Sequence, residues 1–211
     1  MIKPNRNRNG AGFQKNSGTG FQKNSGTGFQ PVSANLQKTK RNLPHWQLGG
    51  STYFLTFNTK GFEFSPEDRK IVFDACFYWQ GKKWNLHQIV VMNDHVHVIA
   101  TPLLIGPDYI PDSPVENRPP VENRWHSLGE IVHSIKRFSA HEINQRHGRR
   151  GPVWWDEYYD RLLRNQEEFE QKWQYIRYNP IKGGLTARLE DYEFYWDERQ
   201  GKDNKNTSST G

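Results

Sequence analysis

Apolar side chains recur along the middle of the chain with two spacings, one typical of strands and the other typical of helices. Runs rich in β-branched and aromatic residues predict strands, and apolar residues three or four positions apart predict helices with one buried face. The predicted strands are 51–58, 84–92, 95–101 and 158–164, and the predicted helices are 66–79, 127–147 and 166–178. The order is β-α-β-β-α-β-α, whose first six elements match the ferredoxin-like split βαβ plan. We therefore predict an α+β fold with a four-stranded antiparallel sheet, two helices on one face and a further C-terminal helix.

Capping residues support the starts of two of these helices. Ser65 is a suitable N-cap in front of Pro66, whose fixed backbone angle suits the first helical position. Ser127 has Glu130 three residues further on, which is the pattern of a capping box.

The segments outside this pattern have a different composition. Residues 12–30 repeat the octapeptide Gly-Phe-Gln-Lys-Asn-Ser-Gly-Thr, and one Phe per repeat cannot build a core. We therefore expect residues 1–42 to be a disordered arm. A Pro-rich stretch over 103–124 contains a second short duplication and is interpreted as a loop insertion, and 200–211 is expected to be a flexible tail. This leaves residues 43–199 as one folded domain.

Most of the positive charge lies at the N-terminus. The net charge is +6, from 29 basic and 23 acidic side chains, yet residues 1–41 hold eight Lys or Arg and no acid. The remainder therefore has 21 basic and 23 acidic side chains, and its net charge is −2. This distribution predicts a basic arm that adds contacts to phosphates, and it gives no evidence that the folded part is basic.

Two further properties of the composition exclude whole classes of protein. The single cysteine, Cys76, excludes an intramolecular disulfide and a thiolate metal site. The chain has no run of 18 apolar residues and no apolar signal segment near its start. We expect a cytoplasmic protein that does not bind membranes.

The tripeptide His95-Val96-His97 is the first candidate for chemistry. Side chains two residues apart on a strand point to the same face, so both imidazoles are expected side by side. Two neutral imidazoles at that separation can share one divalent ion. The dipeptide Asn93-Asp94 predicts a tight turn, which places the pair near the start of the second strand of a hairpin. Two polar residues on a solvated face remain the alternative interpretation.

The last predicted helix carries the second candidate group. Tyr175 and Asn179 are four residues apart and share a helix face, and Lys172 lies three residues before Tyr175. Asn179 precedes Pro180, so we expect it at the end of the helix, where a C-terminal cap is its alternative role. Tyr175 could also be a packing residue, and spacing alone does not choose between Tyr175 and Tyr178.

These residues suit phosphate chemistry assisted by a metal ion. A tyrosine phenol is a weak nucleophile near neutral pH because its ordinary pKa is about 10, and a divalent ion helps by polarising the phosphate. Two imidazoles and an amide oxygen leave coordination positions open, and this ligand set predicts Mg²⁺ or Mn²⁺. Asp160 is an alternative carboxylate ligand. The candidates for binding DNA phosphates, which could equally be solvated surface cations, are Lys136, Arg137, Arg149, Arg150 and Lys172.

Two stretches of the sequence carry a family resemblance. His95-Val96-His97 resembles the histidine-hydrophobic-histidine (HUH) motif of single-stranded-DNA transesterases. Residues 151–165, followed by Tyr-Ile-Arg-Tyr-Asn-Pro-Ile-Lys-Gly-Gly-Leu over 175–185, resemble the REP-associated tyrosine transposases, relatives of the IS200/IS605 transposases with one catalytic tyrosine (Y1). The resemblance covers roughly residues 44–197 and is interrupted by the Pro-rich insertion.

The resemblance implies a function and a set of roles. Tyr175 would attack a DNA phosphate, form a 5′-phosphotyrosine link and free a 3′-OH. His95 and His97 would bind the metal with Asn179, at a position where IS200/IS605 enzymes usually carry Gln. The partners would be single-stranded DNA hairpins, bound by a monomer or homodimer associated with the nucleoid. A non-catalytic DNA or RNA hairpin-binding protein derived from this family is the alternative.

Overall fold

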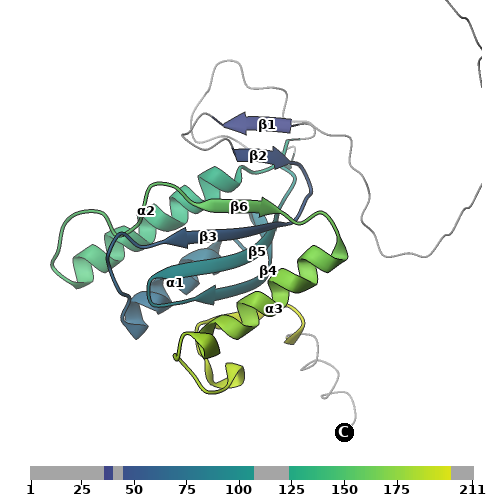
Figure 1. Ribbon diagram of the computed structural model, residues 1–211. Helices are drawn as coiled ribbons and strands as arrows, with labels where there is room; N and C mark the ends of the chain where they lie inside the picture. The colour runs from purple at the N-terminus through teal and green to yellow at the C-terminus, as the bar shows by residue number, and fades with distance from the viewer. Residues whose placement is uncertain (1–35, 40–44, 107–123, 201–211) are drawn as a thin grey trace, which may run out of the picture. The chain divides into compact units, whose positions relative to one another are not determined.

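The computed structural model describes residues 36–39, 45–106 and 124–200 (Figure 1). Its main sheet has five antiparallel strands in the order β6-β3-β5-β4-β7. The strands are β3 (Tyr53–Asn58), β4 (Trp84–Val91), β5 (His95–Pro102), β6 (Tyr159–Leu162) and β7 (Tyr195–Asp197). The helices are α1 (Pro66–Tyr78), α2 (Leu128–Arg146), α3 (Gln166–Lys182) and the short 3₁₀ turn η1 (Leu189–Asp191).

The predicted fold class is confirmed, with one correction to the strand count. The split βαβ plan is formed by β3, α1, β4, β5, α2 and β6. Its last strand, β6, lies beside its first strand, β3, as this plan requires. The sheet has a fifth strand, β7, which pairs with the edge of β4. The sequence analysis missed β7 because three residues are too few to show an alternating pattern.

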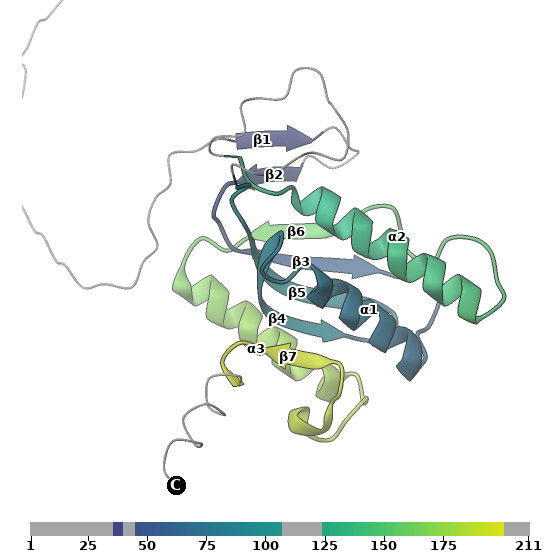
Figure 2. The ribbon, with the colours of Figure 1, turned by 180° about the vertical axis from the view of Figure 1, so that it is seen from behind.

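The helices lie in two layers, one on each face of the sheet. Helices α1 and α2 contact each other, and Figure 2 shows them in front of the sheet when it is seen from behind. Helix α3 packs mainly on β4 and β5, and it lies in front of the sheet in Figure 1. Alternate residues of each strand therefore face either the α1/α2 layer or the α3 layer.

The helix starts follow the local sequence, but the end of α3 does not. Ser65 and Asp68 form a reciprocal capping box, and the Ser127 hydroxyl accepts a hydrogen bond from the Glu130 amide. Helix α3 continues through Pro180 to Lys182, so the prediction that it ends near residue 178 is wrong. The proline removes one backbone donor, and its buried position in the helix offsets that loss.

A second, two-stranded sheet precedes the main one. Strand β1 (Leu36–Thr39) pairs with β2 (His45–Leu48), so the expected disorder over 1–42 is wrong for Leu36–Thr39. The Gln47 side chain anchors β2, because it donates to the His126 carbonyl and accepts from the Leu128 amide. The rest of the basic arm, most of the Pro-rich insertion and the tail beyond residue 200 lie outside the described residues. Within the described ranges, no helix is long and apolar enough to cross a membrane.

Candidate active site

The register of β5 places the two histidines on the face of the sheet that α3 covers. His97 is opposite Thr56 of β3 and His95 is opposite Asn58. The two imidazole centroids are 4.7 Å apart. The predicted side-by-side arrangement is therefore confirmed, while the role of the pair stays a prediction.

One nitrogen of each imidazole is already held by a neighbour. His95 Nδ1 is 2.6 Å from Asp94 Oδ1, and His97 Nδ1 is 2.7 Å from Thr56 Oγ1. His97 is only 4% exposed, and its Nε2 atom is buried and has no hydrogen-bond partner. An unpartnered nitrogen in such a place costs free energy unless a ligand meets it. A histidine whose Nδ1 is fixed by an oxygen has the arrangement of a metal ligand that binds through Nε2.

The environment of His97 keeps its ring neutral. Burial, together with the neighbouring His95 and Lys172, lowers the pKa of His97 to about 3. A neutral imidazole is the form that binds a metal ion.

Helix α3 places Tyr175 beside His97 and Lys172 above Phe54. The Tyr175 ring centroid is 5.1 Å from that of His97 and 5.9 Å from that of Phe54. Lys172 Nζ is 4.8 Å from the Phe54 centroid and 5.3 Å from the Tyr175 centroid. Tyr175 is 44% exposed, so part of the residue is accessible to a large substrate. We refer to His95, His97, Lys172 and Tyr175 as the His–Tyr site.

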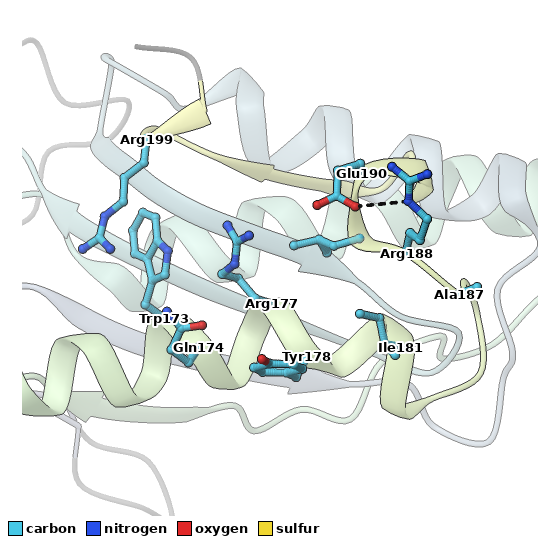
Figure 3. A pocket seen from close by; sticks show the side chains of 10 residues that line it. Trp173, Gln174, Arg177, Tyr178, Ile181, Ala187, Arg188, Glu190 and Arg199 are labelled. Atoms are coloured by element: carbon cyan, nitrogen blue, oxygen red, sulfur yellow. Dashed lines mark ion pairs between the residues drawn. The ribbon is translucent and has the colours of Figure 1, made fainter. Parts of the chain in front are cut away.

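The structure separates the two tyrosines that spacing alone could not. Tyr178 lines a pocket of about 510 Å³ between α3 and the segment after it, together with Trp173 and Arg177 (Figure 3). Its ring is 63% exposed. Tyr175 is therefore the tyrosine of α3 that contacts the histidine pair.

Asn179 lies on the same side of α3, one turn after Tyr175. Its amide nitrogen donates to the Tyr175 carbonyl at 2.8 Å, which leaves the amide oxygen for another partner. One turn later, Gly183 lies so close to Met92 that an added Cβ would be 2.9 Å from the Met92 methyl carbon. Met92 begins the turn that leads to His95, so α3 runs from His97 towards that turn and Asn179 lies between.

The side chains predicted to bind a metal ion are two imidazoles and one amide. Among the residues that the structure describes, no group of three His, Cys, Asp or Glu side chains could hold a metal ion. Asp160 does not join the histidines, because it is opposite Leu55 and so points to the α1/α2 face. The alternative of Asp160 as a ligand is therefore wrong. The unpartnered His97 Nε2 and the fixed Nδ1 atoms fit a divalent ion, and an amide oxygen and substrate oxygens would complete its ligands.

Only one of the five cations proposed to bind DNA is at the His–Tyr site, and that is Lys172. Lys136 is 8% exposed, and its ammonium group donates to the carbonyl oxygens of residues 155, 156 and 157. Its charge holds a loop, so the structure gives no support to the predicted contact of Lys136 with phosphate. Arg137, Arg149 and Arg150 lie on α2 or just after it, in the layer on the opposite face of the sheet.

The sequence analysis missed three residues that support the site. Phe54 stacks on His97 with centroids 5.3 Å apart, and Thr56 and Asp94 fix the imidazoles. Asp94 could have been found, because it is adjacent to a histidine at a turn. Phe54 and Thr56 lie about 40 residues away, and only the pairing of β3 with β5 brings them close.

Among the comparisons with known proteins, only the solved structures match this chain. No family model matches the chain, and no curated protein does. Among solved structures, a REP-associated tyrosine transposase bound to a REP hairpin is similar, with a TM-score of 0.54 and 17% identity over 74% of this chain and 82% of that chain. The chain therefore has a fold like that of the single-tyrosine transposases.

Two further solved structures match less closely. A candidate transposase from Deinococcus radiodurans has a TM-score of 0.36 and 18% identity over 66% of this chain and 95% of that chain. A bacterial tRNA(His) guanylyltransferase-like protein in complex with GTP has a TM-score of 0.42 and 10% identity over 67% of this chain and 69% of that chain.

Proposed function

We propose that this protein is a metal-dependent DNA strand transferase of the transposase type, which nicks and rejoins single-stranded DNA at hairpin-forming repeats. The observation that carries the proposal is the contact between Tyr175 and His97, whose Nε2 atom is buried without a partner. A nucleophile and an unused metal ligand next to each other are what phosphoryl transfer to a tyrosine needs. The fold shared with a transposase bound to a REP hairpin supports the choice of substrate.

His95, His97 and Asn179 would hold Mg²⁺ or Mn²⁺. When bound, the ion supplies polarisation of the scissile phosphate and neutralises part of its charge. Asp94 and Thr56 keep each imidazole oriented, so that little reorganisation accompanies binding. Lys172 adds a positive charge beside the Tyr175 ring, where it stabilises the developing phenolate and the phosphate.

The transfer step exchanges one phosphodiester for another. The Tyr175 oxygen forms a bond to phosphorus, the bond from phosphorus to the 3′ oxygen breaks, and the phenol proton passes to solvent. The leaving 3′ oxygen takes up a proton and becomes a free 3′-OH, while the 5′ side stays linked to Tyr175. Attack by a 3′-OH on this phosphotyrosine reverses the step and rejoins a strand. No external energy source is required, because each step breaks one phosphate ester and forms another.

A covalent-adduct assay tests the proposal. The probes are labelled DNA hairpins with single-stranded flanks, copied from the flanks of the protein's own gene, and the medium contains Mg²⁺ or Mn²⁺. We expect a labelled adduct with the wild-type protein and none with Tyr175→Phe, which removes only the nucleophilic oxygen. Tyr178→Phe is the matched control, and it should form the adduct at the wild-type level.

Binding measurements distinguish the enzyme from a hairpin-binding relative. Tyr175→Phe should bind the same hairpin with unchanged affinity, since its ring still packs on Phe54. Hairpin binding without an adduct, in the wild-type protein and at all metal concentrations, would show a non-catalytic binding protein. An adduct mapped by mass spectrometry to Tyr178 would overturn the assignment of the nucleophile.

A further inference from the structure

The His–Tyr site has an open side on the part of the sheet formed by β3 and β6. Helix α3 packs mainly on β4 and β5, so the edge strand β6 is at the side of the site that the helix covers least. Tyr159 of β6 is opposite Thr56, which is opposite His97. The three side chains form one row across the sheet and point to the same face. Tyr159 is 51% exposed, although it lies within a strand.

Tyr159 and the nucleophile lie around the same buried ring. The Phe54 centroid is 6.4 Å from that of Tyr159 and 5.9 Å from that of Tyr175, and Phe54 itself is 3% exposed. A phosphate attacked by Tyr175 would carry a nucleoside on each side, and one of these would lie at the open side of the site. Tyr159 is the exposed aromatic ring on that side.

Two cations accompany Tyr159 on this face. Lys172 lies above Phe54, between the helix and the sheet. Arg161 is two residues from Tyr159 along β6 and therefore on the same face, and its guanidinium donates to Glu168 at 3.2 Å. The hydrogen bond to Glu168 is the largest cause of a raised pKa of Arg161, and a hydrogen bond with Tyr159 also contributes. Cations beside an exposed aromatic ring are the arrangement that binds single-stranded nucleic acid without reading its sequence.

We propose that Tyr159 is a base-stacking residue that binds the unpaired nucleobase next to the scissile phosphate, with Lys172 and Arg161 beside the strand. The inference rests on the proposed function, since it takes the position of the phosphate from Tyr175. Stacking requires a base that is free of a complementary strand. Tyr159 therefore favours a single-stranded flank over a duplex and helps to hold the phosphate in line with the tyrosine hydroxyl.

Fluorescence of a reporter base tests this inference separately from cleavage. The probe is a dT oligonucleotide of 12 nucleotides with one central 2-aminopurine, and all proteins carry Tyr175→Phe so that no strand is cut. We expect the parent protein to quench the 2-aminopurine and Tyr159→Thr to lose this quenching. Its affinity should also fall about tenfold, as expected when one stacking contact is lost. Tyr159→Trp should keep both the quenching and the affinity.

Tyr178→Thr is the matched control, because Tyr178 is also exposed but lines the pocket on the other side of α3. It should bind the probe like the parent protein. An ultraviolet crosslink from 5-iodouracil, mapped by mass spectrometry to Tyr159, gives the same information without a substitution in β6.

The outcomes separate this inference from the proposed function. Unchanged affinity and quenching in a folded Tyr159→Thr protein, or a crosslink that maps elsewhere, would overturn the stacking role. Formation of the Tyr175 adduct together with that result would leave the transferase standing. Loss of quenching without any adduct in the wild-type protein would instead reject the transferase and retain a single-strand binding site at Tyr159.

Discussion

The two faces of the central sheet are built from the same strands but from different chemistry. On the α1/α2 face, Leu55, Val96 and Val98 are fully buried aliphatic side chains. On the α3 face, Gln88 and His97 are polar, yet Gln88 is fully buried and His97 is only 4% exposed. The first face stabilises the fold by removing apolar surface from water. On the second face, the burial of polar groups costs free energy of folding, and such burial is the usual sign of a functional site.

The polar side chains of the α3 face are held from several elements. Gln88 donates to the Trp173 carbonyl and to the Tyr195 hydroxyl. Asp197 of β7 accepts hydrogen bonds from Arg177 of α3 and from Tyr195. These bonds fix how α3 lies on the sheet, and so they determine which side of the helix faces His97. Substitutions on the two faces should therefore have different consequences.

The largest effect is expected at the histidines. His97→Ala or His95→Ala should reduce adduct formation at least about 100-fold, because each would remove a ligand of the proposed ion, and such an ion stabilises the transition state by several kcal/mol. The circular dichroism spectrum should remain that of the folded protein. His133→Ala, at an exposed histidine on α2, is the matched control and should cleave normally. Wild-type cleavage by either site variant would rule out the metal site.

A smaller effect is expected when only the support of His95 is changed. Asp94→Asn keeps the size of the side chain but removes the carboxylate that fixes His95 Nδ1. The Mn²⁺ concentration for half-maximal nicking should rise about 10- to 100-fold, as for other residues that orient metal ligands. Asp156→Asn changes an exposed carboxylate elsewhere and should leave the Mn²⁺ titration unaltered. The same titration curve for both variants would show that Asp94 does not orient a metal ligand.

The same substitution, Lys to Met, should lower stability at Lys136 on one face and weaken DNA binding at Lys172 on the other. Lys136→Met removes the donor of three carbonyl groups, so the free energy of unfolding should fall by about 1–3 kcal/mol. The salt dependence of DNA binding should not change. Lys172→Met should lower the slope of log affinity against log salt by about 0.9, the value for one phosphate contact. A reduced slope for Lys136→Met would restore its role as a phosphate ligand.

The smallest effect is expected in the apolar core. Ile89→Val on the α1/α2 face should lower the free energy of unfolding by about 0.5–1.5 kcal/mol and leave the nicking rate of the folded protein unchanged. Val90 is the next residue but is opposite His97 on the α3 face. Val90→Ala should reduce nicking as well as stability, because it leaves a gap beside the imidazole. Urea denaturation measures the stability of each variant, and nicking rates at equal concentrations of folded protein measure its activity. Equal nicking by the two variants would contradict the distinction between the faces.

Much of the fold could be predicted because it depends on local sequence. The strands and helices of the split βαβ plan each contain enough residues to show an alternating or helical period, and Ser65 and Ser127 mark two helix starts. Strands β1, β2 and β7 were not predicted, because these short segments gain their stability from the strand beside them. The end of α3 was placed too early, because the preference of Asn179 for an extended backbone before Pro180 is weaker than the packing of the helix.

The sequence by itself determined that His95 and His97 share a face and that Tyr175, Lys172 and Asn179 share another, because side-chain direction within one element follows from its period. Only the tertiary structure decided that these two faces meet, that Tyr178 faces a different pocket and that Asp160 points away. It also decided that Lys136 holds a loop and that Tyr159 and Tyr175 both contact Phe54. The reason is physical: the burial and the partners of a side chain depend on elements far away in the chain, and a local pattern contains no information about which of them will pack against it.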